Sequence, residues 1–345
     1  RRGAPAGVRR VLGAVLGLVL ATVAGARTVE ITVLNTTDLH GALCRTPGVY
    51  AERNDGSLLQ CATLVRRVRA EKPAALLLDC GDVFQGTAVS YLSRGGVMAT
   101  AMNAMGYDAC VPGNHEFDWG VDALAAFLDQ LQAQPLAANL QAGPEAPAAF
   151  RRFLPFVVKE IDGVKVAIVG LTTPNIPNWT RGVALRDLRF QDSRPALEAT
   201  LPLVRRERPQ VLILLVHQGL SAADDAANQL NGIGRRFGEF DLVLGGHLHA
   251  AVPGVRLGRT DYGQAGSGAT GVLRVDLTFD TVKNAVTDKK FAFLPVAPDV
   301  PEDETIAAQV APDLRRADEW LGRKVGRTKT DLVASVALPG LCSVQ

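Results

Sequence analysis

The chain of 345 residues alternates short, almost wholly apolar runs with longer amphipathic segments. Strands that are buried on both faces of a sheet have this continuous apolar character, because helices cover both sides. Such runs occur at 29–35, 74–79, 166–170, 211–216 and 241–246. Segments with apolar residues at the three-and-four spacing of amphipathic helices lie between them, at 64–72, 121–134 and 196–208. Strands that alternate with helices predict an α/β domain built of stacked layers.

The first 26 residues have the composition of an export signal. Four arginines within residues 1–10 precede an apolar run of small residues, and Ala24-Gly25-Ala26 offers an A-x-A-like cleavage site. This pattern predicts a secretory signal peptide over 1–26 and a periplasmic or secreted protein. The alternative is a membrane anchor, which needs about 20 apolar residues, and the run is shorter than that. We therefore expect no stable membrane span after the signal is cleaved.

The net charge and the cysteines exclude some kinds of partner and metal site. The formal net charge is +2, so no strong field would recruit a nucleic-acid polymer. The five cysteines show no C-x-x-C spacing, which argues against a thiolate metal site: Cys44, Cys61, Cys80, Cys110 and Cys342. In an exported chain cysteines can form disulfides, and an odd number leaves at least one of them unpaired. The sequence does not determine the pairing, and structural cysteines are the default interpretation.

All five histidines fall in four short blocks, each at or just beyond the end of a strand-like run. The blocks are Asp38-Leu39-His40, Asn114-His115-Glu116-Phe117-Asp118, His217, and Gly246-His247-Leu248-His249. Asp82 of Cys80-Gly81-Asp82 follows a run in the same way. Ligands in open α/β sheets bind beyond the carboxyl ends of the strands, so we expect these side chains at one edge of one sheet. The two-residue spacing in D-x-H and H-x-H would point both side chains the same way from extended backbone.

Each of these residues also has a structural interpretation. His217 could be a buried histidine at a strand end, while Asp82 and Asn114 could be turn or helix-capping residues. Those interpretations do not explain why histidine occurs nowhere else in the chain. Asp, Asn and imidazole ligands without Cys suit divalent Mn, Zn, Fe or Co. The ligands are too many for one tetrahedral ion, and two ions about 3.5–4 Å apart, sharing a carboxylate, would clamp a phosphoryl group.

The ordered motifs TTDLHG, GDVFQG, GNHEFDWG, VHQG and GGHLH resemble those of the calcineurin-like metallophosphoesterases. Within that family they are most similar to the secreted 5′-nucleotidase and 2′,3′-cyclic phosphodiesterase group, from about Thr32 to about Leu332. The resemblance implies an α/β, layered βαβ sandwich with a dimetal site at the carboxyl ends of the strands. It also implies a catalytic domain over 27–301 and the truncated start of a C-terminal nucleotidase domain over 323–345. The residues between them, 302–322, are expected to form a linker helix that is interrupted or kinked at Pro312.

The resemblance further implies a role for each site residue. The expected ligands are Asp38, His40 and His249 for the first metal, Asn114, His217 and His247 for the second, and Asp82 as the bridging carboxylate. Asn114 and His115 are the expected substrate-binding residues, and His115 and Asp118 the catalytic pair. An imidazolium at His115 would stabilise phosphoryl charge, and Asp118 would raise its pKa and fix its tautomer. Glu116 is expected to be structural, and Phe117 and Trp119 to pack.

The function implied is an exported phosphohydrolase that removes phosphate from nucleoside 5′-monophosphates or related nucleotides by attack of a metal-bridging hydroxide. Its partner would be a small-molecule nucleotide, and the sequence sets no oligomeric state. A phosphodiesterase for 2′,3′-cyclic nucleotides or nucleotide sugars is one alternative, and release of thiosulfate groups from a carrier protein is another. An alternative of a different class is a non-catalytic secreted metal-binding remnant. The His115–Asp118 pair opposes that alternative, because an inert domain has no need of a histidine that is not a ligand.

Overall fold

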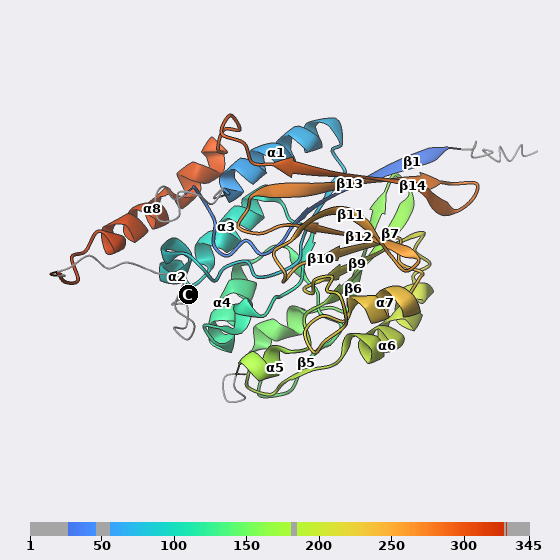
Figure 1. The fold of residues 1–345 in the computed structure, drawn as a ribbon, viewed down its shortest axis with the longest axis horizontal. Helices are drawn as coiled ribbons and strands as arrows, with labels where there is room; N and C mark the ends of the chain where they lie inside the picture. The colour runs from blue at the N-terminus through green and yellow to red at the C-terminus, as the bar shows by residue number, and fades with distance from the viewer. Residues whose placement is uncertain (1–26, 46–55, 181–184, 328, 330–345) are drawn as a thin grey trace, which may run out of the picture.

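The computed structural model describes residues 27–45, 56–180, 185–327 and 329 (Figure 1). Two six-stranded sheets pack face to face, and helices cover the outer face of each, so that the domain has four layers. The predicted signal peptide over 1–26 lies outside the described residues, as do Cys342 and residues 330–345 of the predicted C-terminal segment. This architecture confirms the α/β layered fold expected from the sequence.

The first sheet combines the first four strands of the domain with its last two. Its order is β14 (Ala285–Pro295), β13 (Gly271–Asp280), β1 (Thr28–Thr36), β2 (Leu76–Asp79), β3 (Ala109–Cys110) and β4 (Gln134–Pro135). Strands β1 to β4 are parallel, while β13 and β14 continue the sheet as antiparallel strands beside β1. The carboxyl ends of β1, β2 and β3 therefore lie along one edge.

The second sheet is built from strands in the middle of the chain. Its order is β11 (Ala251–Leu257), β12 (Thr260–Ala265), β10 (Leu242–Gly245), β9 (Val211–Val216), β7 (Val164–Leu171) and β6 (Phe156–Ile161). The central strands β12, β10, β9 and β7 are parallel, and β11 and β6 form antiparallel edges. A separate short ribbon pairs β5 (Leu140–Ala142) with β8 (Leu188–Phe190).

The alternation of side chains along each strand builds three apolar layers. In β9, Ile213 and Leu215 face the first sheet, while Leu212 and Leu214 face the helices. In β1, Ile31 and Val33 likewise lie between the sheets. Because successive strand residues point to opposite faces, a run that is apolar at every position is buried on both sides. This is the physical reason for the continuous apolar runs in the sequence.

Helices cover the two outer faces. The first sheet is covered by α1 (Leu58–Glu71), α2 (Ala88–Ser93), α3 (Gly96–Met105), α4 (Val121–Gln130) and α8 (Glu304–Leu321). The second is covered by α6 (Ser193–Arg206) and α7 (Leu230–Arg236). The remaining helical turns are α5 (Ile176–Trp179), η1 (His115–Phe117) and η2 (Ala148–Arg152). None of the helices in the described ranges is long and apolar enough to cross a bilayer.

Three expectations need correction. The apolar runs form strands, but they belong to two sheets and not to one, because β7, β9 and β10 pair with one another and pack against the first sheet. The helix expected over 121–134 ends at Gln130, since Gln134 and Pro135 pair with β3. Helix α8 continues through Pro312, so the helix is not interrupted there, as one of the two expected forms would have it. Pro312 and Ala308, the residue whose carbonyl loses its helical partner, are both exposed, so water can satisfy that carbonyl.

Candidate metal centre

The sequence blocks that hold the histidines meet where the carboxyl edges of the two sheets face each other. The segments after β1, β2 and β3 bring Asp38, His40, Asp82, Asn114 and His115 from the first sheet. The segments after β9 and β10 bring His217, His247 and His249 from the second. The gathering expected from the sequence is therefore present, although it spans two sheets.

These side chains form two groups that could each hold a metal ion. One group contains Asp38, His40, Asp82 and His249, and the other contains Asp82, His217 and His247. Within each group the possible ligand atoms lie within 4.8 Å of one another. Asp82 belongs to both groups and is 1% exposed. One buried carboxylate thus stands between two clusters of nitrogen and oxygen donors.

Distances within the groups show how closely the donors converge. Nε2 of His217 lies 3.1 Å from Oδ2 of Asp82 and 3.2 Å from Oδ1 of Asn114, which places Asn114 beside the second group. In the first group, Nε2 of His249 lies 3.5 Å from Oδ1 of Asp38. The Nε2 atoms of His40 and His249 are 2.9 Å apart. Donor atoms of several side chains therefore face a common space.

The backbone at these residues is left-handed, which the sequence analysis did not anticipate. Residues Asp38, His40, Asp82, His247 and His249 all have positive φ, between 48° and 74°. The expectation of extended backbone in D-x-H and H-x-H was therefore wrong, and His247 and His249 enter different groups. Left-handed backbone is unfavourable for residues with a side chain and persists where the surroundings fix it. Here the amide of Asp38 donates to Gly81 O at 2.8 Å, and that of His40 to Asp82 O at 2.9 Å.

Backbone carbonyls set the orientation of two imidazoles. Nδ1 of His217 lies 2.6 Å from the carbonyl oxygen of Cys80, and Nδ1 of His40 lies 3.1 Å from that of Gln85. A carbonyl only accepts, so each Nδ1 carries the hydrogen and donates it. In the neutral form of each ring the lone pair is then on Nε2, the atom that faces the group, as is usual for histidines that bind metals. The roles of Cys80 and Gln85 are not visible in the sequence, because a backbone carbonyl accepts a hydrogen bond whatever side chain its residue carries.

The electrostatics of the centre fit a cation. Burial and the neighbouring His217 lower the pKa of His247 to about 4, and burial and His40 do the same for His249. Both rings are therefore neutral at pH 7, the form in which histidine binds metals. Burial would raise the pKa of Asp82, but the charge of His217 and the other histidines holds it below its usual range. A buried carboxylate among imidazoles, two of which are neutral at pH 7, is a donor set that suits divalent transition metals.

His115 stands beside the two groups and belongs to neither. Its Nδ1 lies 2.6 Å from Oδ2 of Asp118, one turn later along η1, and its amide donates to Oδ1 of Asp82 at 2.8 Å. Burial lowers the pKa of His115, but the hydrogen bond with Asp118 and the charge of Asp82 outweigh this and raise it. The side chain is 30% exposed, so a ligand can reach it. The ring is thus oriented, biased towards its charged form and accessible.

Glu116 joins the two segments that carry Asp82 and Asn114. It is 2% exposed and accepts three backbone hydrogen bonds, from Asp82 at 2.8 Å, Val83 at 2.7 Å and Gly113 at 2.6 Å. Gly113 is required here, because a Cβ at that position would collide with the carboxylate of Asp82. The sequence predicts a structural role for Glu116, and these contacts show which segments its carboxylate holds together.

Glu116→Gln is expected to loosen this junction. Glutamine has one acceptor oxygen, so its NH2 group must face a backbone N–H and leave at least one buried donor unpaired. We expect the free energy of unfolding to fall by about 1–3 kcal/mol and metal affinity to fall about tenfold. Denaturant unfolding and calorimetric metal titration measure the two effects. The exposed Glu160→Gln variant is the control, and unchanged metal affinity in Glu116→Gln would show that Glu116 does not position the ligands.

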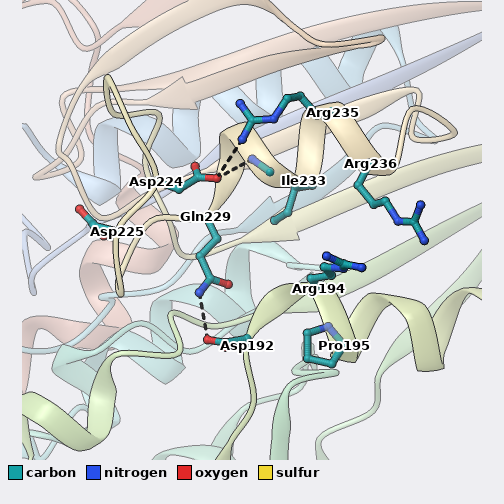
Figure 2. Close-up of a pocket in the computed structure, with 10 residues that line it drawn as sticks. Asp192, Arg194, Pro195, Asp224, Asp225, Gln229, Ile233, Arg235 and Arg236 are labelled. Carbon is teal, nitrogen blue, oxygen red and sulfur yellow. Dashed lines mark hydrogen bonds and ion pairs between the residues drawn. The ribbon is translucent and has the colours of Figure 1, made fainter.

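A separate cavity of about 600 Å³ lies between α6 and α7 (Figure 2). Its lining includes Arg194, Arg235 and Arg236 but no residue of the two ligand groups. The arginines already pair with acids, Arg235 with Asp224 at 3.7 Å, and Arg194 and Arg236 with Glu198 at 3.0 and 3.4 Å. The cavity therefore offers an anion little uncompensated charge, and the chemistry of the chain centres on the histidine cluster.

Comparison with known proteins agrees with this geometry. A family model described as calcineurin-like phosphoesterase matches residues 31–251, which include every residue of the two ligand groups. The chain belongs to this family. Phosphoesterases are hydrolases of phosphate esters, and this is the reaction class of the family.

Individual members of the family with known names are also similar to this chain. A rat 5′-nucleotidase (Rattus norvegicus) is 33% identical over 231 residues, which cover 65% of this chain and 38% of that protein. A mouse 5′-nucleotidase (Mus musculus) is 31% identical over 327 residues, covering 87% and 55%. The structure of the calcineurin-like phosphoesterase YfkN from Bacillus subtilis shares the fold with a TM-score of 0.75 at 23% identity, covering 86% of this chain and all of that one. The chain thus spans about two fifths to just over half the length of these 5′-nucleotidases.

Proposed function

We propose that this chain is an exported, metal-dependent phosphohydrolase of the 5′-nucleotidase type. The observation that carries the proposal is the pair of ligand groups sharing the buried Asp82, with the His115–Asp118 pair beside them. A structural metal site needs only the ligands. An accessible histidine that is held by a carboxylate and excluded from the ligand groups is a device for handling charge on a substrate.

Two divalent ions fit the donors. The first would be held by Asp38, His40 and His249, the second by Asn114, His217 and His247, and Asp82 would contact both. Ions bound there would act as Lewis acids on phosphoryl oxygens and lower the pKa of bound water. Mn, Zn, Fe and Co all accept mixed imidazole, carboxylate and amide ligands, and the donor set does not choose among them.

The protein's own groups supply the remaining chemistry. His115, held by Asp118 and biased towards its charged form, would donate a hydrogen bond to a phosphoryl oxygen as negative charge develops there. The Asn114 amide, beside the second group, would keep the phosphate in register. The amide of His115 is fixed by Asp82, so the ring and the ligand groups keep a constant spacing. Orientation of this kind supplies a large part of enzymatic rate enhancement.

The nucleotide specificity and the export rest on different support. The relatives named 5′-nucleotidases support a nucleotide as substrate. The arginine-rich start and apolar run within residues 1–26 support export to the periplasm or the exterior. Neither depends on the metal centre, so each can be tested alone.

The direct test is turnover of two substrates by the chain loaded with Mn or Zn. We expect release of inorganic phosphate from 5′-AMP, and no release when a chelator has removed the metal. If the protein hydrolyses bis(p-nitrophenyl) phosphate but not 5′-AMP, it is a phosphodiesterase and not a nucleotidase. Turnover of neither substrate by protein with bound metal would favour the non-catalytic remnant and overturn the proposal.

A further inference from the structure

Trp179 lies at the end of α5, the short helix that follows β7 at the edge where the ligand groups gather. Its indole ring is 5.4 Å from the imidazole of His247, centroid to centroid, at an interplanar angle of 38°. The segment is anchored by the fully buried Ile176 and by the hydroxyl of Thr173, which donates to Ala227 O at 3.0 Å. The position of the indole is therefore set by the fold.

Two exposed apolar side chains flank His247, one in space and one in sequence. Trp179 is 48% exposed, and Leu248, which lies between His247 and His249, is 42% exposed. Large apolar side chains gain free energy when they leave water, so half of this gain is unrealised at both residues. The donors that face the metal groups are Asp, Asn and His, whereas this neighbouring surface offers an aromatic face and an aliphatic side chain. A substrate with a charged part and an apolar part matches that division.

We propose that Trp179 stacks on the aromatic base of the nucleotide whose phosphate occupies the adjacent metal centre. This inference rests on the proposed function and adds to it a determinant of the leaving group. Only the ribose separates base from phosphate in a 5′-nucleotide, and Trp179 is one ring removed from the proposed ligand His247. Offset stacking between an indole and a base is favourable and tolerates any base, because every base has a π face. The site then prefers phosphate esters of nucleosides over those of plain sugars.

A purely structural role for Trp179 is the competing explanation. The indole could serve only to hold the ring of His247 in place. Loss of Trp179 would then affect every substrate equally, because the disturbed ligand is common to all of them. Loss of a stacking partner would affect only substrates that carry a base. The ratio of the rates for a substrate with a base and one without therefore distinguishes the two roles, even if both absolute rates change.

The test compares 5′-AMP with ribose 5-phosphate, which has the same ester and no base. In the metal-loaded protein, Trp179→Ala is expected to lower the ratio of their kcat/KM values about tenfold, the effect of losing one stacked base. Trp179→Phe, which retains an aromatic face, is expected to keep most of the ratio. Trp320→Ala, which removes a 43% exposed indole from α8, is the matched control and should keep the wild-type ratio. An unchanged ratio in Trp179→Ala would overturn the proposal.

A binding measurement gives a second readout without turnover. Adenosine carries no phosphate ester and can be titrated at equilibrium, and the chain has only Trp119, Trp179 and Trp320 as tryptophan fluorophores. Adenosine is expected to quench the fluorescence of the wild type and of Trp320→Phe, whereas Trp179→Phe should lack this change and ribose should cause none. Equal quenching in Trp179→Phe would place the base elsewhere and reject the inference. If adenosine quenches Trp179 but the protein hydrolyses neither 5′-AMP nor ribose 5-phosphate, the stacking inference holds and the proposed function is wrong.

Discussion

Asp82→Ala is expected to remove metal from both ligand groups and to abolish turnover. Asp82 is the one residue common to the two groups, and it supplies a buried negative charge that would face two dications. Without Asp82, the first group keeps one carboxylate, that of Asp38. The second group then contains no carboxylate, since its other members are His217 and His247. Loss of a residue that merely hydrogen-bonds a ligand costs about 10–100-fold in metal affinity, so loss of the shared ligand should exceed about 10²-fold.

Metal content after dialysis, measured by atomic emission, checks this expectation. Asp82→Asn is the sharper variant, because its side-chain oxygen can still accept the amide hydrogen of His115, now held by Oδ1 of Asp82 at 2.8 Å. It removes the charge and keeps the local packing, so loss of metal in this variant cannot be attributed to misfolding. The exposed Asp129→Ala is the control and should retain wild-type metal content. Two ions per chain in Asp82→Ala would refute a shared ligand.

The same charge also affects the protein without metal. Burial lowers the pKa of His217, but Asp82 and Asp38 overcome this and raise it to about 10. In Asp82→Ala the main partner of that imidazolium is gone, and we expect its pKa to fall, because the opposing burial remains. The ring then becomes neutral and avoids the cost of an unpaired buried charge. For this reason the variant should still fold, and the loss of metal is a property of the site.

Much of the architecture is readable from the sequence because burial on both faces leaves a strong signal. The runs at 29–35, 166–170 and 211–216 become β1, β7 and β9 with bounds that shift by two residues or fewer. The gathering of the histidines was also predictable, since each follows a strand and parallel strands end at a common edge. The alternation of side chains along β9 also explains the position of His217. It follows Ile213 and Leu215 on the face towards the first sheet, where it meets Asp82.

The division into two sheets was not predictable from the same runs. A strand covered by a sheet and a strand covered by a helix are equally apolar on that face, so Ile31 gives no sign that its neighbours are strands. The left-handed backbone at Asp38 and His247 was hidden as well, because neither residue is a glycine. Carbonyl partners such as that of Cys80 leave no mark in a sequence. Trp179 was overlooked because its place beside His247 depends on contacts between two segments far apart in the chain.

The second large effect is expected from His115→Ala, which should lower kcat about 10²- to 10³-fold while both ions stay bound. The size is that of losing one donor that acts on transition-state charge. Retention of metal follows from the geometry, because His115 belongs to neither ligand group, and the contact of this residue with Asp82 is made by its backbone amide, which alanine keeps. Single-turnover rates and metal content, measured on the same preparation, test both halves of the expectation.

Asp118→Asn separates the charge of the ring from its presence. Asparagine can hold Nδ1 of His115 through its amide oxygen but removes the carboxylate whose hydrogen bond raises the pKa of that ring. Less of the imidazolium then remains at neutral pH, so the rate should fall by about tenfold, less than in His115→Ala, with metal content again unchanged. A ring that served only to pack beside His40 would tolerate Asp118→Asn with no loss of rate. A loss of metal in either variant would instead make His115 part of the metal site, and the distinction between the His–Asp pair and the two ligand groups would fail.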